Sequence, residues 1–243
     1  MIYTKKYRYK PIYKKFVKLK ANVQNRNKLN KYKKTKWKNL LFHLNKLNKH
    51  KKRNCYYKFY DQHSYTVLKY NNFFSRNYKQ KVIEKKRLNL FYGSLSKIWL
   101  KTQVNKSEKK SNQIKNQIKS NFFLIIFLEQ RLDIIITRSH FVLSVRNARQ
   151  LILHGHVLVN NKITKDYSKI LKKSDIISFS PKVHKLIQYY VASSYLWPLP
   201  PSYLQISYKI YQIQVIEDLL LSSYSYKFFY YLNLNNIIKS YKK

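Results

Sequence analysis

The chain has 243 residues, with 51 Lys and Arg against 9 Asp and Glu, and a formal net charge of +42. A folded monomer with that charge repels itself strongly, so we expect a polyanionic partner, nucleic acid rather than an anionic membrane. A single cysteine, Cys55, excludes a disulfide framework and a multi-cysteine zinc site, and the longest apolar run, seven residues from Phe122 to Leu128, is too short to cross a membrane.

The N-terminal quarter of the chain is entirely basic. Residues 1–60 carry 21 Lys or Arg and no carboxylate, which is typical of an extension that becomes ordered on its partner. Up to residue 33, Tyr and Phe are interleaved with the cations, and they are expected either to stack on unpaired bases or to pack on neighbouring helices. The cations expected to contact RNA here are Lys5, Arg8, Lys10, Lys14, Lys15, Lys18 and Arg26.

Residues 61–120 are predicted to form a helical domain and a linker, preceded by a helix that begins at Thr35. An apolar stripe in that first helix is expected to be core; it consists of Trp37, Leu40, Leu41, Leu44 and Leu47. Tyr78 to Gln103 also has a helical pattern, with Ile98 among the inward positions. Gly93 interrupts that pattern, so a break or a close helix contact is expected there.

Two expectations concern the rest of this segment. Lys85, Lys86 and Arg87 are candidate RNA contacts on the helix before Gly93. Residues 104–120 are polar, with a short "NQIK" repeat, and are predicted to be a loop or an exposed helix that forms the main domain boundary.

Residues 121–181 carry the densest structural signal. Phe122 to Arg138 is predicted to be one helix, and Ser144 is a suitable N-cap for a second helix whose apolar face contains Val145, Ala148, Leu151 and Ile152. That helix is expected to end at His154, with Gly155 in a left-handed conformation. A hairpin follows: a strand over 157–159, a turn at Asn160-Asn161, a return from Ile163, a second turn at 173–175 and a closing strand over 176–179.

The composition makes the arginines informative. The sequence contains 42 Lys but only 9 Arg, together with many Tyr and Asn and few Ala and Gly, which indicates an AT-rich genome such as that of an organelle. Four of the arginines nevertheless lie within 19 residues. Arginine offers planar, multi-donor contacts, so RNA phosphates are the predicted partners, with internal ion pairs to Glu129 or Asp133 as the alternative. The four are Arg131, Arg138, Arg146 and Arg149.

Further RNA contacts are predicted on the same segment, and other residues are assigned structural roles. His154 and His156 flank Gly155 without an apparent third metal ligand, so contact with RNA is favoured over a metal site, and no cofactor is expected. Asp133 is expected to cap a helix or to pair with an arginine. The other predicted contacts are Gln150, Asn160, Lys162, Lys165, Lys172 and Lys173.

At these residues the sequence resembles the RNA-binding domain named after small-subunit ribosomal protein 4, the S-four domain. The matching motifs are "RLD" from Arg131, "RNARQLILHGHVLVNNK" from Arg146, and "KKSDIISF" from Lys172. The flanks also resemble the ribosomal protein family: "YDQH" at residues 60–63, "YKQKVIEKKRLNLFYGSL" from Tyr78, and "WPLPPSYLQISYK" from Trp197. The N-terminal segment is most similar to mitochondrially encoded members.

The resemblance implies an α+β fold: a helical basic N-terminal region, a small helix–helix–hairpin RNA-binding domain over residues 121–181, and a C-terminal β and aromatic extension over 182–243 that packs on the N-terminal domain or on neighbouring proteins. It implies a structural, non-enzymatic component of a mitochondrial small ribosomal subunit, with a plastid as the second choice.

The partners implied are small-subunit rRNA, ribosomal protein 5 and mRNA where it enters its channel, with roles in assembly and translational accuracy and no homo-oligomer. Two alternatives remain: a pseudouridine synthase-like enzyme, in which the "RLD" aspartate would be catalytic, and an RNA-binding assembly factor that is not a permanent subunit.

Overall fold

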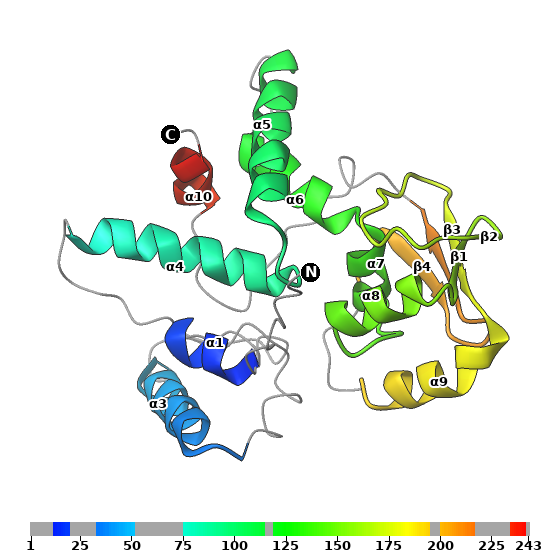
Figure 1. Cartoon of the computed structure of the whole chain (residues 1–243), viewed down its shortest axis with the longest axis horizontal. Helices are drawn as coiled ribbons and strands as arrows, with labels where there is room; N and C mark the ends of the chain where they lie inside the picture. The colour runs from blue at the N-terminus through cyan, green and yellow to red at the C-terminus, as the bar shows by residue number, and fades with distance from the viewer. Residues whose placement is uncertain are drawn as a thin grey trace, which may run out of the picture. The chain divides into compact units, whose positions relative to one another are not determined.

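The computed structural model describes residues 12–19, 33–51, 75–114, 119–194, 200–216 and 234–241 (Figure 1). The chain divides into two compact units. The first unit contains helices α1, α3 and α4, and the second contains the remaining helices and a sheet. The predicted α+β class is confirmed. Among the described residues, no helix has both the length and the hydropathy of a membrane span.

The first unit is built from α1 (Ile12–Leu19), α3 (Thr35–Lys51) and α4 (Ser75–Phe91). The helix predicted from Thr35 is therefore confirmed, and Trp37 is fully buried, with its ring centroid 5.9 Å from that of Phe16 on α1. The side chains of Leu44 and Leu47 lie outside the described residues. Helices α1 and α4 are linked by a hydrogen bond of 2.9 Å from the Arg87 guanidinium to the carbonyl of Leu19.

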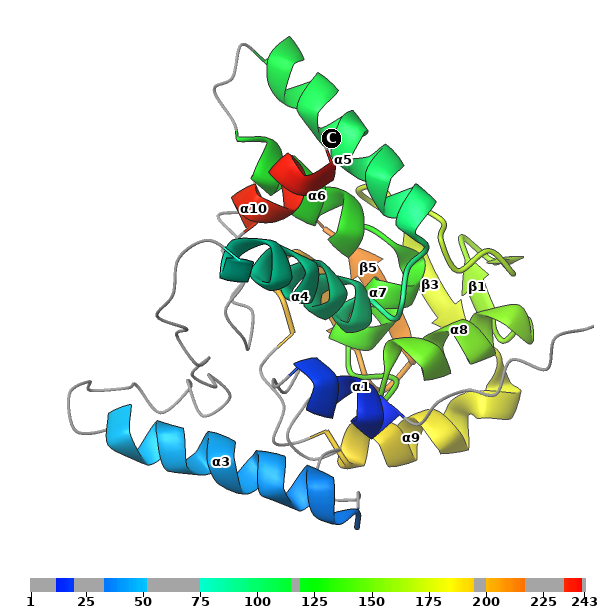
Figure 2. The same ribbon diagram turned by 60° about the vertical axis from the view of Figure 1, so that its left-hand side comes forward.

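In the second unit, α5 (Lys97–Gln113) packs on α6 (Ser120–Glu129), and α10 (Leu234–Tyr241) lies against both (Figures 1 and 2). The break expected at Gly93 is confirmed: Gly93 has φ +76°, and α5 begins after an N-cap at Ser96. The division between the units falls between Phe91 and Tyr92, not within residues 104–120, because those residues belong largely to α5. Ile98, predicted to face inward, is 79% exposed.

The single helix predicted from Phe122 to Arg138 is wrong, because the chain forms α6 and then α7 (Leu132–Arg138). Arg131, between them, is extended, with ψ 140°. The backbone amide of Leu132 donates to the carbonyl of Lys169 at 2.9 Å, and that of Leu171 donates to Gln130 at 2.9 Å. Hydrogen bonds to a segment about 40 residues later in the chain thus replace those that would have continued the helix.

The predicted helix and hairpin are confirmed. Helix α8 (Val145–Leu153) begins at Ser144, whose hydroxyl accepts from the amide of Asn147, and it ends before Gly155, which has φ +74°. Strands β1 (Val157–Val159) and β2 (Lys162–Ile163) pair antiparallel across a turn in which Asn160 and Asn161 both have positive φ. Strand β3 (Ile176–Phe179) then pairs with β1 on its other side.

The sheet is larger than the hairpin alone and has five strands in the order β2-β1-β3-β5-β4. The added strands are β4 (Leu204–Ser207) and β5 (Gln212–Val215), and β5 pairs with β3. The strand predicted around "YLQIS" is confirmed. Residues 182–243 were predicted to be an extension that packs on the N-terminal domain or on neighbouring proteins, but β4 and β5 from this segment join the sheet of residues 121–181 through the pairing of β5 with β3. A short helical turn, η2 (Pro181–Val183), and α9 (His184–Ala192) lie between β3 and β4.

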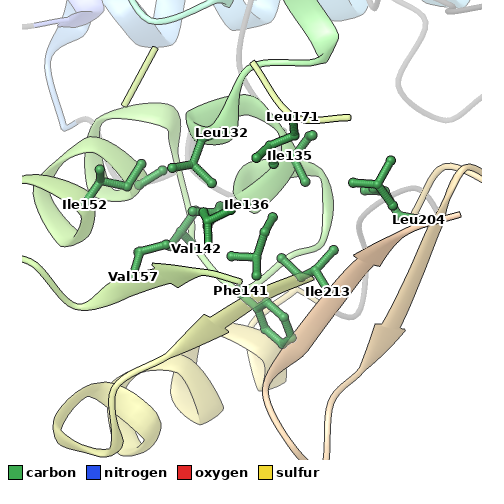
Figure 3. Close-up of a cluster of buried hydrophobic side chains, with 14 of the residues drawn as sticks. Leu132, Ile135, Ile136, Phe141, Val142, Ile152, Val157, Leu171, Leu204 and Ile213 are labelled. Atoms are coloured by element: carbon green, nitrogen blue, oxygen red, sulfur yellow. The ribbon is translucent and has the colours of Figure 1, made fainter. Parts of the chain in front are cut away.

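The core of the second unit lies between one face of this sheet and helices α7 and α8 (Figure 3). Strand residues alternate between buried and outward positions, so Val157 and Val159 point into the core and Leu158 points away. Ile135 and Ile136 of α7 and Ile152 of α8 cover that buried face. This packing fixes α8 and the hairpin relative to each other, so the polar side chains on their outer surfaces have defined positions.

Candidate nucleic-acid interface

The predicted lysines on the hairpin side of the second unit are all available to a partner. Lys162, Lys165, Lys172 and Lys173 are exposed, on β2 and in the loops that flank β2 and β3. An ammonium group on a flexible stem binds phosphate as a point charge, without a fixed geometry. These four side chains therefore form a basic border along the hairpin.

The C-terminal end of α8 lies beside this border. Gln150 and His154 are exposed on α8 and its cap, and the rings of His154 and His156 have centroids 6.3 Å apart. His156 is half-buried and its Nδ1 lies 3.2 Å from the Ser180 hydroxyl. A Cβ built on Gly155 would lie 3.9 Å from Cε of Lys165, so the helix end and the returning strand are adjacent. We name Gln150, His154, Lys162 and Lys165 the helix–hairpin surface.

Three of the four clustered arginines form an internal network instead. Asp133 is completely buried and accepts two hydrogen bonds from Arg131, at 3.0 and 2.9 Å, and one from Nε of Arg149 at 2.7 Å. Arg149 also donates to the backbone carbonyls of Tyr92 and Gly93. Asp133 therefore links α7 to α8, and Arg149 in turn links α8 to the segment that precedes α5.

A second carboxylate makes a parallel set of contacts. Glu129 is also completely buried and accepts from Nε and Nη2 of Arg138 at 3.0 and 2.9 Å. The Tyr92 hydroxyl donates to the same carboxylate at 2.7 Å. Both acids thus receive forked guanidinium pairs, the geometry that arginine provides and lysine cannot.

Aromatic rings complete the network. The Arg131 guanidinium carbon lies 4.6 Å from the ring centroid of Trp99 and 5.9 Å from that of Tyr167, and the Arg149 guanidinium carbon lies 5.0 Å from Tyr167. Trp99 and Tyr167 were not among the residues predicted from the sequence. No local motif marks them, because they reach the arginines from α5 and from the loop before β3.

These contacts correct the prediction for the arginines. Arg131 is 1% exposed and cannot contact RNA in this fold, so its predicted RNA contact is wrong and the alternative, an ion pair with Asp133, is what the structure shows. The guanidinium groups of Arg138 and Arg149 are likewise engaged with Glu129 and Asp133, and only 18% and 17% of their side-chain surfaces are exposed. The expectation that Asp133 pairs with an arginine is confirmed. Arg146, half-buried in the first turn of α8, stays a predicted RNA contact.

Two other predicted contacts have structural roles. Asn160 is exposed, but its side chain donates to Asp175 and accepts from the amide of Ile176, both at 2.9 Å, which fixes the β1–β2 turn to the start of β3. Arg87 is 5% exposed and bonds to α1, so burial contradicts its predicted RNA contact.

The remaining predicted contacts lie in the first unit. Lys14, Lys15 and Lys18 are exposed on α1, whose buried side carries Phe16 and Leu19. Lys86 is exposed on α4 and Lys85 is half-buried. The other predicted contacts lie outside the described residues; they are Lys5, Arg8, Lys10 and Arg26.

The structural role predicted for Gly93 follows from its surroundings. A Cβ at this position would lie 2.6 Å from Cγ1 of Val145 and 2.8 Å from Nη2 of Arg149, both on α8. Only glycine combines the positive φ with this close approach. Among the residues described, no group of three or more His, Cys, Asp or Glu is placed to hold a metal ion.

Comparison with known proteins shows what this segment is similar to. Residues 130–177 match the S4 domain. The chain is 35% identical over 128 residues to small ribosomal subunit protein uS4m of Reclinomonas americana, and the aligned segment covers 53% of this chain and 47% of the relative. It is 32% identical over 123 residues to small ribosomal subunit protein uS4B of Clostridium acetobutylicum, covering 51% and 59%. A third relative, uS4m of Dictyostelium citrinum, is 40% identical over 92 residues, covering 37% of this chain and 28% of the relative.

The chain thus spans about half the length of the first two curated relatives. The matched segment contains α8 and the β1–β2 hairpin, and it contains Asp133 with its arginine partners. Four residues that contact the arginines or Glu129's partners lie before it: Tyr92, Gly93, Trp99 and Glu129 itself. The matched segment therefore includes all four residues of the helix–hairpin surface. Residues 130–177 therefore match the S4 domain, and the chain is similar to small ribosomal subunit protein uS4, as its sequence motifs predicted.

Proposed function

We propose that this protein is a structural, rRNA-binding component of the small subunit of a mitochondrial ribosome. The observation that carries the proposal is the helix–hairpin surface: a rigid S4-domain core presents Lys162, Lys165, Gln150 and His154 on one helix end and the adjoining strand. The similarity to ribosomal proteins, two of them named as mitochondrial, supports the particle and the compartment.

The proposed mechanism is electrostatic and geometric. Each lysine that neutralises a phosphate releases condensed counterions, and this release supplies most of the affinity. The amide of Gln150 and the imidazole of His154 can hydrogen-bond to ribose hydroxyls or base edges, while the fixed angle between α8 and the hairpin selects an RNA shape. The exposed lysines of α1 would extend the contact in the first unit.

Asp133 argues for a structural rather than an enzymatic role. A catalytic aspartate has to reach its substrate, whereas this carboxylate is completely buried and accepts hydrogen bonds from two arginines. Folded rRNA of the 5′ domain is the proposed ligand, and support of assembly and decoding accuracy, contact with ribosomal protein 5 and proximity to incoming mRNA belong to the same proposal.

Sedimentation tests this function. The tagged chain should migrate with small subunits at about one copy per particle and dissociate at high salt, because its affinity rests on displaced counterions. A protein that migrates only as a free chain would refute the proposal. A stoichiometry far below one would favour the alternative of a transient assembly factor. Loss of an rRNA modification in an Asp133→Ala variant whose particles assemble normally would favour an enzyme.

A further inference from the structure

The outer face of the sheet differs chemically from the exposed side of helix α5 in the same unit, which carries several lysines. Alternation along the strands turns one set of side chains away from the core, and the polar members of this set carry no charge. They are Ser178, Gln205, Ser207, Gln212 and Gln214. We name this surface the outer sheet face.

The strand register places these polar side chains side by side. Gln205 lies opposite Gln214, and Gln212 lies opposite both Ser207 and Ser178. The three glutamines are exposed, so their amides are available as donors and acceptors to a molecule that approaches the sheet.

Apolar side chains continue the same face toward β1 and β2. Ile176, opposite Gln214, is 41% exposed, and Ile163, opposite the half-buried Leu158, is 65% exposed. The described residues therefore leave a neutral, partly apolar surface uncovered on the side of the sheet opposite α7 and α8 (Figure 1).

The absence of lysine from these outward strand positions is informative, because lysine is the commonest polar residue of this chain. Helix α5 of the same unit exposes Lys97, Lys101, Lys106 and Lys109. Solvent-exposed strands do carry lysine, and at the edges of sheets natural proteins use it to prevent unwanted pairing. A solvated outer face in a chain of formal charge +42 would therefore be expected to carry lysines.

The lysines near this sheet lie at its ends instead. Lys162, Lys172 and Lys173 lie near the β1–β2 turn and the start of β3, and Lys209 lies in the turn between β4 and β5 at the opposite end. All four are exposed. A neutral centre with a charged border is the arrangement of a protein–protein interface, in which charged residues are depleted from the middle and remain at the rim.

We propose that the outer sheet face docks a neighbouring protein whose surface has an uncharged, hydrogen-bonding centre and acidic groups at its periphery. RNA is the less favoured occupant, because contacts with phosphates dominate RNA affinity and the centre of this face has no cation. The inference rests on the proposed function, which places the chain in a particle where another protein can adjoin it.

The area of the face fits a contact inside such a particle. Five strands about 4.8 Å apart and about 13 Å long give roughly 300 Å², less than the roughly 800 Å² per partner of an independent complex. A contact of this size serves two proteins that rRNA already holds together, because the second contact is then intramolecular.

Photo-crosslinking in purified small subunits tests the occupant. Benzoylphenylalanine replaces Gln214 on the outer sheet face or, as a matched control, Gln113 at the exposed end of α5. We expect the probe at Gln214 to crosslink to one small-subunit protein present at one copy per particle, and the control probe not to reach that protein. An RNA adduct at Gln214, no crosslink there, or crosslinks scattered over several proteins would each overturn the inference.

Adding positive charge to the outer sheet face gives a second test. It should weaken binding of a protein but strengthen binding of RNA, so the direction of the change distinguishes these two occupants. In the Gln212→Lys/Gln214→Lys variant, the protein crosslink from a probe at Gln205 should fall at least tenfold, because two unpaired charges enter a neutral interface. Affinity for rRNA should not fall. If the face instead lies on RNA, the added lysines strengthen binding and the protein crosslink at Gln205 is absent; an unchanged protein crosslink would also overturn the inference.

The control variant Asn112→Lys/Gln113→Lys on α5 adds the same charge and should leave the crosslink from Gln205 unchanged. Failure of the proposed function is distinguishable, because a chain that never enters the small subunit gives no particle in which to crosslink. A chain that enters normally but contacts no protein through this face would overturn only the present inference.

Discussion

Replacing Asp133 by alanine removes the single carboxylate that faces both Arg131 and Arg149. The variant loses three hydrogen bonds of 2.7–3.0 Å and leaves Arg131, whose side chain is 2% exposed, as a buried cation without its carboxylate. Breaking a buried ion pair on one side destabilises a protein by about 3–5 kcal/mol. Since domains are stable by only about 5–15 kcal/mol, this loss is a large share of the total.

The matched control is Asp166→Ala, which makes the same change of charge at an exposed position. Asp166 accepts only local hydrogen bonds, from the amide of Ser168 at 2.8 Å and its hydroxyl at 2.6 Å, so its removal should destabilise by about 1 kcal/mol or less. Thermal unfolding of the full chain followed by circular dichroism should show a Tm about 10–20 °C lower for Asp133→Ala and a few degrees lower for the control. Equal shifts for the two variants would refute the assignment of the network as a stabilising element.

Three other outcomes follow from the geometry. Gly93→Ala should destabilise the protein more than Gly155→Ala, and denaturant unfolding compares the free energies of the two variants. Both glycines have positive φ, but an added Cβ would collide with α8 only at Gly93, whereas at Gly155 its nearest neighbouring atom would lie 3.5 Å away. Lys162→Ala/Lys165→Ala should make the slope of log K for rRNA against log salt about 2 units less steep, and an unchanged slope would contradict phosphate contact at these lysines. Burial raises the pKa of Tyr208 above its unfolded value of about 10. The stability contributed by its neutral hydroxyl is therefore complete below the unfolded pKa and is lost as pH rises through the folded pKa. Over that pH range, the unfolding free energy of Tyr208→Phe should fall less than that of the unsubstituted protein.

Local sequence rules predicted the parts of the S4 domain that depend on local physics. A serine cap, a glycine in the left-handed region and two asparagines at a turn each specify backbone angles within a few residues, and all three were found as expected. The break between α6 and α7 was missed because its cause is not local. The apolar residues on both sides of Gln130 match one helix, and backbone hydrogen bonds to residues 167–171 interrupt it.

The sheet was underestimated for a similar reason. Strand β5 pairs with β3 although more than 30 residues and α9 separate them, and nothing in either strand identifies the other as its partner. The inward prediction for Ile98 failed because α5 starts a new helical phase after the Gly93 break, so positions counted through the glycine no longer lie on one side.

The clustering of the arginines correctly indicated a need for forked hydrogen bonds, but RNA phosphate was the wrong partner for three of them. In a chain rich in lysine, arginine is retained where a planar guanidinium is needed, and here the guanidinium groups bind buried carboxylates. Arg131 and Arg149 both bond to Asp133, and Arg138 bonds to Glu129. The exposed positions of the helix–hairpin surface carry lysine, since a solvated phosphate contact needs only a mobile charge. Arginine therefore forms the internal ion pairs of this domain, while lysine supplies the positive charge of its exposed surface. Because lysine supplies that charge, the outer sheet face, whose outward strand positions carry no lysine, lacks the group that binds phosphate, and we therefore infer a protein as its partner.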